Sequence, residues 1–170
     1  MTVYYTASGA PAAATKGLSA SLRAEFQLIQ TAFAMLSPAG GTAVSIPYTF
    51  STTTTVADPG VGTLRLNQAT QNTATAVLAD LSDANSTDVT NVLALFDDST
   101  STVKGFLRLV KLGDSTDWLL FSVASMTSPS GYRNIVVTNV ASSAASPFAD
   151  GDDILIEFAR TGDKGETGEP

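Results

Sequence analysis

The sequence contains no cysteine and no histidine among its 170 residues. The lack of cysteine excludes disulfide frameworks and thiolate zinc sites. The lack of histidine excludes Ser-His-Asp and Cys-His nucleophile systems and histidine-based pH switches. We therefore expect no catalytic centre, no metal site and no cofactor.

Basic residues and long apolar runs are also scarce. Nine Lys and Arg stand against sixteen Asp and Glu, a net charge of −7, which is unsuited to binding a phosphate backbone. The densest apolar stretches, 32–36 and 154–156, are far shorter than the ~18 residues of a membrane-spanning helix. Residues 1–17 lack the basic start and apolar run of a secretory signal. We expect neither nucleic-acid partners nor membrane insertion.

Residues with hydroxyl side chains are frequent, and charged residues are scarce. The chain has 18 Ser and 23 Thr, and only 15% of its residues are charged, against ~25% in a typical globular protein. After residue 42, segments rich in Val, Ile, Thr and Phe alternate with turn clusters containing Gly, Pro, Asp and Ser. The predicted strands are 44–57, 61–68, 75–82, 103–112, 117–125, 132–140 and 153–160.

These strands predict a mainly β domain over residues 42–161. Seven strands joined by short turns are typical of an antiparallel β-sandwich or a small barrel. One short internal helix is predicted at 88–97, where Asp88 precedes apolar residues at helical spacing and is expected to cap the helix.

The segment 103–112 carries apolar residues on both faces. Leu107 and Leu109 point to one face, and Phe106 and Val110 point to the other. A strand with this pattern is expected to be covered on both sides.

The amino-terminal part differs from the β domain in composition and hydrophobic pattern. Residues 1–17 predict an extended arm, and residues 18–41 predict an amphipathic helix with a linker. The helix carries a single apolar stripe at spacings of 4, 3, 4 and 3, made of Leu22, Phe26, Ile29, Phe33 and Leu36. Two interpretations stay open: the stripe packs on the β domain of its own chain, or it is a self-associating coil or a peg that docks into another protein.

The last nine residues, 162–170, form three G-X-Y triplets that begin at Gly162, Gly165 and Gly168. Only glycine fits at the axis of a collagen triple helix, which explains why this period is strict. The triplets predict a collagen-like segment and, with it, a homotrimer. The alternative is a chance pattern in a glycine-rich loop.

Three groups of residues were weighed for chemistry. The oxygen ligands Asp80, Asp83, Asn85 and Asp88 are of the type that binds calcium, but their spacing fits no twelve-residue calcium loop, and turn or cap roles are favoured. The pairs 97–98 and 152–153 are carboxylates of the type used in glycoside hydrolysis, but adjacent strand residues point to opposite faces. The remaining group is a sugar-stacking platform of Trp118 and Tyr132, for which a core role of the tryptophan is the alternative.

Three stretches resemble proteins of tailed-bacteriophage virions. Residues 8–11 (SGAP) and 22–29 (LRAEFQLI) resemble the start of phage tail fibres and related appendages. Residues 58–67 (DPGVGTLRLN) are similar to a β domain of phage tail proteins with collagen-like repeats, in which that domain runs directly into G-X-Y triplets, as residues 158–165 (FARTGDKG) do here. The given sequence ends after three triplets, without the receptor-binding tip of that group.

The resemblance implies a non-enzymatic virion structural protein, a tail fibre or fibre adaptor that assembles in the host cytoplasm. The arm and helix are then expected to attach to other phage tail or connector proteins. The triplets start a host-recognition shaft, with a host-surface glycan or receptor as a further partner. The alternatives are a head or neck decoration fibre, a carbohydrate-binding adhesin module and a polysaccharide depolymerase.

Overall fold

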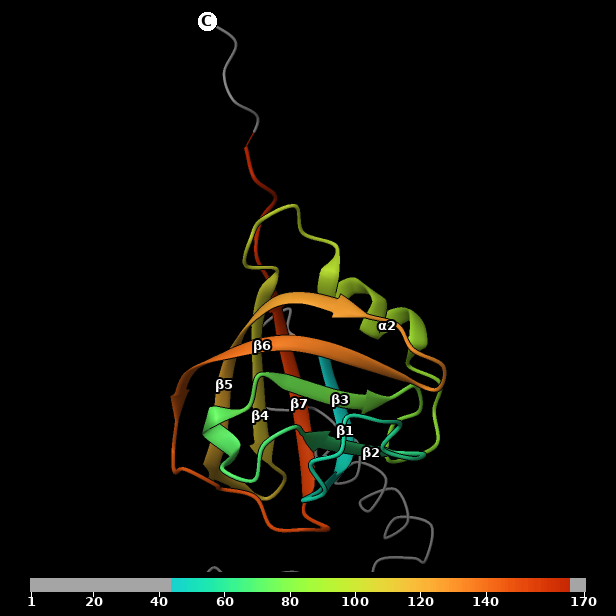
Figure 1. The fold of residues 1–170 in the computed structure, drawn as a ribbon, viewed down its shortest axis with the longest axis vertical. Coiled ribbons are helices and arrows are strands. Elements are labelled where there is room, and N and C mark those ends of the chain that lie inside the picture. The colour runs from blue at the N-terminus through green and yellow to red at the C-terminus, as the bar shows by residue number, and fades with distance from the viewer. Residues whose placement is uncertain (1–43, 166–170) are drawn as a thin grey trace, which may run out of the picture. The chain divides into compact units, whose positions relative to one another are not determined.

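The computed structural model describes residues 44–165, and they are dominated by a closed barrel (Figure 1). The strands follow one another around the barrel in the order β1-β2-β3-β6-β5-β4-β7. They are β1 (Val44–Ser51), β2 (Thr63–Leu66), β3 (Ala76–Asp80), β4 (Gly105–Lys111), β5 (Asp114–Thr127), β6 (Tyr132–Ser142) and β7 (Asp153–Arg160). Of the two predicted architectures, the small barrel is observed and the sandwich is wrong. Every strand of the described barrel has two neighbours, although β1 pairs with β2 only over residues 49–51.

The pairing of β1 with β2 corrects the expectation of a fully antiparallel sheet. These two strands run parallel, with Thr49 opposite Thr63, whereas the other pairings around the barrel are antiparallel. The predicted strand 44–57 stops at Ser51, and the chain returns through residues 52–62 before β2 begins. A parallel pair requires such a crossover, because a tight hairpin reverses the strand direction.

The predicted helix is present but shorter and differently capped. Helix α2 (Thr90–Ala94) continues into the 3₁₀ turn η2 (Leu95–Asp97). The cap position is Val89, and the Asp88 carboxylate instead accepts a hydrogen bond from the Thr90 N–H, at 2.9 Å. A second 3₁₀ turn, η1 (Gln71–Thr73), lies between β2 and β3. None of the helices in residues 44–165 is long and apolar enough to cross a membrane.

The barrel interior is filled by aliphatic and aromatic side chains, and an aromatic pair closes each end. At the end where β7 finishes, Phe96 of η2 stacks on Phe158 with ring centroids 4.1 Å apart. At the other end, Phe148 packs against Phe50 at 5.4 Å. The inward residues of the strands are Ile46, Tyr48, Phe50, Leu64, Leu66, Val77, Ala79, Leu107, Leu109, Leu119, Phe121, Val123, Ile135, Val137, Ile154, Ile156 and Phe158.

A buried tyrosine joins β1 to the end of β3. The Tyr48 hydroxyl donates a hydrogen bond of 2.7 Å to the backbone carbonyl of Asp80. Burial, with repulsion from the Asp80 and Asp83 carboxylates, raises the pKa of Tyr48 above its usual range, so the phenol stays a hydrogen-bond donor.

The outer face of β2 and β3 is covered. Leu78 of β3 alternates with inward-facing neighbours, yet it is fully buried. The 52–62 loop is fastened over this side by Arg65 of β2, whose guanidinium donates to the carbonyls of Thr55 and Asp58 at 3.4 and 2.7 Å. The crossover therefore serves as a lid on the outer face of β2 and β3.

The outer face of β4 is open only in part, which corrects the expectation of full coverage for residues 103–112. Leu107 and Leu109 face the core and are fully buried, but Phe106 is 42% exposed and Leu112, in the turn after β4, is 54% exposed. Val110, on the same outer face as Phe106, is only 5% exposed, so the second face of this segment is covered at Val110 and open at Phe106.

Candidate assembly site at the carboxyl end of the barrel

The predicted G-X-Y segment begins where β7 leaves the barrel. In Figure 1, residues 161–165 continue the line of β7 away from the barrel, beside the loop that joins η2 to β4. Residues 98–104 of that loop and residues 160–164 of the tail together form what we call the exit clasp. Its contacts hold the first triplet against the barrel.

Side-chain hydroxyls make most of the contacts to the first triplet. The Ser99 hydroxyl donates to the Gly162 carbonyl at 3.1 Å, and the Thr100 N–H donates to the Asp163 carboxylate at 3.0 Å. The Lys164 N–H donates in turn to the Thr100 hydroxyl at 2.9 Å. Ser99 is only 1% exposed, so a polar group is buried here with its hydrogen bonds satisfied.

Thr161 extends the pairing of β7 with β4 by one residue. Its N–H donates to the Lys104 carbonyl at 3.0 Å, and its hydroxyl donates to the Val103 carbonyl. The backbone path into the first triplet is therefore fixed by main-chain and side-chain hydrogen bonds together.

The exit clasp also contains a local ion pair. The Arg160 guanidinium lies 2.8 Å from the Asp163 carboxylate and donates to the Asp98 carbonyl at 3.3 Å. The hydrogen bond from the Thr100 N–H, with a further contribution from Arg160, lowers the pKa of Asp163. This carboxylate is therefore charged at neutral pH, and its charge is compensated within the exit clasp.

The glycines of the tail are not required by the described chain itself. An added Cβ at Gly162 or Gly165 would meet no heavy atom within 4 Å, and neither glycine has a positive φ. Gly105 shows what a required glycine looks like, because its added Cβ would lie 2.6 Å from the Ala159 carbonyl oxygen and closer still to the Phe158 ring. The described chain would therefore accommodate a side chain at either tail position.

The other predicted assembly residues lie outside the described residues. These are the third triplet glycine, Gly168, and the helix stripe Leu22, Phe26, Ile29, Phe33 and Leu36. The arm 1–17 and the helix and linker 18–41 also fall there, so their roles remain predictions.

The predicted calcium-type residues are used in local turns. The Asp80 carboxylate accepts from the N–H groups of Gly62 and Ser82, at 3.3 and 2.8 Å. The Asp83 carboxylate accepts from those of Asn85 and Thr87, each at 2.8 Å. Within residues 44–165, no three acidic side chains come together in a way that would hold a metal ion. The geometry favours the turn role over the calcium role.

The two aspartate pairs lie at opposite ends of β7. The 97–98 pair is beside the exit clasp, where Asp97 lies 3.8 Å from the Lys104 ammonium. The 152–153 pair begins the strand, about 26 Å away at ~3.3 Å per residue, far beyond the ~5–9.5 Å between the carboxylates of a glycosidase.

Asp152 has a structural partner of its own. It lies 2.9 Å from the Lys111 ammonium and also accepts from the Ala149 N–H. The Lys111 hydrogen bond, followed by that from Ala149, lowers the pKa of Asp152. This carboxylate is an ion-pair member at the start of β7 and is not paired with a second carboxylate.

The proposed sugar platform is not formed. Trp118 lies near Ser143: the backbone N–H of Trp118 donates a hydrogen bond of 2.9 Å to the Ser143 hydroxyl. Tyr132, at the start of β6, is eleven residues before Ser143. At ~3.3 Å per residue, about 36 Å of chain therefore separates Tyr132 from the position beside Trp118. Trp118 is also half-buried on the outer face of the barrel, so the alternative of a core tryptophan is wrong as well.

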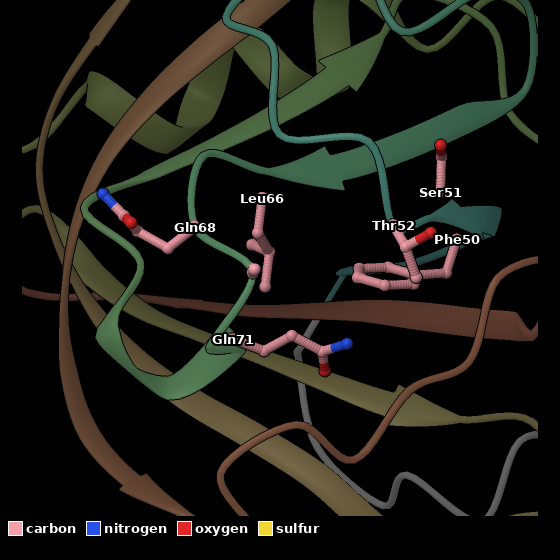
Figure 2. Close-up of a pocket in the computed structure, with 7 residues that line it drawn as sticks. Phe50, Ser51, Thr52, Leu66, Gln68 and Gln71 are labelled. Carbon is pink, nitrogen blue, oxygen red and sulfur yellow. The ribbon is translucent and has the colours of Figure 1, made fainter.

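A small pocket lies at the barrel end opposite the exit clasp. Figure 2 shows Phe50, Leu66 and Gln71 around it. Its volume is about 80 Å³, well below the ~300–1,000 Å³ of typical ligand pockets. The Gln71 amide is already engaged, because it donates to the Phe148 carbonyl at 2.6 Å and accepts from the Phe148 N–H at 3.0 Å. The pocket has the character of a packing gap.

Sequence reasoning missed Ser99 and Thr100, the central residues of the exit clasp. They lie in a run of serine and threonine at 99–102 that carries no motif, in a chain where such residues are frequent. Their partners are more than 60 residues away. One signal was available: the last residues of a strand that leaves a barrel need hydrogen-bond partners.

Comparisons with protein-family models, with curated proteins and with solved structures find no match to this chain. Function is therefore inferred from the chemistry and geometry of the chain itself.

Proposed function

We propose that the protein is a non-enzymatic structural component of a tailed-bacteriophage particle, a tail fibre or fibre adaptor. It assembles as a homotrimer and begins a collagen-like shaft at Gly162. The observation that carries the proposal is the contrast at the tail. The exit clasp holds the first triplet in place, yet nothing in the described chain requires Gly162 to lack a side chain.

A triple helix supplies the missing reason for glycine. Three polyproline II-like chains wind around one axis, and only a residue without a side chain fits there. No heavy atom of the described chain lies within 4 Å of an added Cβ at Gly162 or Gly165, so these positions are not blocked by the protomer itself. The X and Y positions, Asp163 and Lys164, are polar and suited to the outside of such a helix.

The given triplets are too few to hold three chains together. Nine residues at ~3.1 Å each make a shaft of about 28 Å. The association must therefore draw on surfaces of the barrel, on the predicted helix 18–36, or on both. In the fibre-adaptor role, that helix and the arm before it attach to other tail or connector proteins, and the shaft points toward a host receptor.

Light scattering of the purified full chain tests the trimer. The expected mass at micromolar concentration is three times the 17.5 kDa of one chain. A stable 17.5 kDa species would contradict the proposal. Gold-labelled antibodies against the barrel, applied to intact particles, test the location: label on the tail supports a fibre or adaptor, and label on the head or neck contradicts it.

A further inference from the structure

The outer face of β7 must lie beside the axis of the trimer proposed above. Gly162 follows Arg160, the last residue of β7, by two residues, which span at most ~7 Å. The exit clasp fixes these residues to the barrel, and Figure 1 shows the tail continuing the line of β7. If three such tails meet on one axis, the three β7 strands run beside it, and the outer faces near their ends approach one another.

An exposed aromatic ring stands at this position. Phe106 of β4 is opposite Ala159 of β7 on one side and Ser122 of β5 on the other. It faces outward and is 42% exposed. Because both neighbours are small, the ring projects from the sheet. Aromatic side chains of this kind, flanked by small residues, are typical anchors of protein interfaces.

An apolar row lies further down the same side of the barrel. Val110 of β4 is opposite both Leu155 of β7 and Trp118 of β5, and Leu155 is in turn opposite Pro47 of β1. These residues face outward across four adjacent strands; Val110 is buried and the other three are partly buried. The open side of the barrel is thus apolar both beside the exit clasp and further from it.

Charge favours contact near the exit clasp. A chain with a net charge of −7 repels its own copies unless the contact surface is neutral. Between Phe106 and the apolar row, the charged groups are Arg108 and Glu157, which neutralise each other at 3.0 Å. The acidic residues Asp114 and Asp117 lie at the far end of β4 and β5.

We propose that the outer face of β4 and β7 beside the exit clasp is the contact between barrels, with Phe106 as its anchor and a second copy of this chain as its partner. The contact is heterologous, as a three-fold axis requires, so Phe106 of each copy meets the β7 side of the next. This inference rests on the proposed trimer.

A pair of lysine substitutions tests the face in the full chain. Phe106→Lys places a charge at the proposed anchor, and Val136→Lys is the matched control. Val136 is also an outward apolar residue, 38% exposed, and it lies on β6, three strands from β7 around the barrel. Light scattering at micromolar concentration is expected to show a threefold loss of mass for Phe106→Lys and none for Val136→Lys.

Cross-linking gives an independent answer, because the chain has no natural cysteine. Ala159→Cys, treated with a short bismaleimide, is expected to give a covalent pair of chains, and Val136→Cys is expected to give none. This measurement decides the question even if Phe106→Lys fails to fold.

The outcomes separate the two proposals. A monomeric wild-type protein overturns the trimer itself. A trimeric wild type whose Phe106→Lys variant keeps its mass, and whose Ala159→Cys variant does not cross-link, leaves the trimer standing but overturns this face. A lower melting temperature of Phe106→Lys at unchanged mass also overturns it, because a segment of the same chain, such as residues 18–36, would then cover the ring.

Discussion

Replacing Gly162 with alanine separates the needs of the barrel from those of the shaft. The added Cβ meets no heavy atom within 4 Å in the protomer, and the residue has no positive φ. The Gly162 carbonyl, which accepts from Ser99, is retained in alanine. The barrel should therefore tolerate the change, whereas a triple helix should not, since a single substitution of an axial glycine disrupts it.

The magnitudes follow from the space at each glycine. Gly162→Ala should change the free energy of unfolding of the barrel by less than ~0.5 kcal/mol. Gly105→Ala is the contrasting variant, because its Cβ would lie 2.6 Å from the Ala159 carbonyl oxygen in a paired strand. Overpacking of this kind costs ~1–3 kcal/mol, which lowers the melting temperature of a barrel of this size by roughly 3–15 °C.

Thermal unfolding followed by circular dichroism measures the stability of the barrel. Limited trypsin digestion measures how well the tail is protected from cleavage. Lys164 is a trypsin site within the first triplet, and Gly162→Ala leaves both residues of the scissile bond unchanged. Loss of the triple helix should speed cleavage after Lys164 by about tenfold or more, which is ~1.4 kcal/mol of lost protection. Equal cleavage rates for wild type and Gly162→Ala would refute the axial role of this glycine.

Three further predictions address the core, the exit clasp and the amino-terminal region. Tyr48→Phe removes the hydroxyl that donates to a β3 carbonyl and leaves a buried acceptor without its partner, so urea unfolding should show a loss of ~1–3 kcal/mol. The pKa of Asp163 is lowered in the folded chain, so its bond with the Thr100 N–H should stay intact as the pH falls past the ordinary aspartate pKa and be lost only as the pH falls through the lowered pKa. The Thr100 amide resonance followed from pH 6 to pH 2 reports this, and a transition at the ordinary aspartate pKa would contradict it. Joint substitution of Phe26→Asp and Ile29→Asp should leave a folded, soluble barrel that is not incorporated into particles; normal incorporation, or an unfolded barrel, would contradict the helix as the attachment element.

The strands were predictable where the pattern is local. Strand β7 occupies Asp153–Arg160, the predicted range, because its inward and outward residues alternate without interruption. Strand β1 was predicted too long because Thr52 to Thr55 have high β propensity. The chain turns away after Ser51, where the Asp150 carboxylate accepts from the Thr52 N–H at 2.8 Å. That partner is 98 residues away, and a local pattern does not contain it.

The choice between barrel and sandwich was not predictable for the same reason. Closure depends on β7 pairing with both β1 and β4, and the strand pattern alone is compatible with either architecture. The apolar residues on both faces of 103–112 gave a real signal, and the second face is covered at Val110 but open at Phe106. A residue such as Phe106 is apolar whether it meets its own chain or another copy.

In the proposed trimer, the exit clasp would let a short set of triplets begin a shaft at a defined point. Winding three chains requires ordering of all three at once, and fixing each residue of a backbone costs ~1–2 kcal/mol. In each copy, Thr161 to Lys164 are already held by Ser99, Thr100 and the β4 backbone. Much of that ordering is therefore completed when the barrel folds, before the chains meet. Contacts between barrels that bring three exit clasps together then need to supply only the remaining association energy. In the proposed trimer, the barrels therefore associate first, and the shaft forms from Gly162 outward.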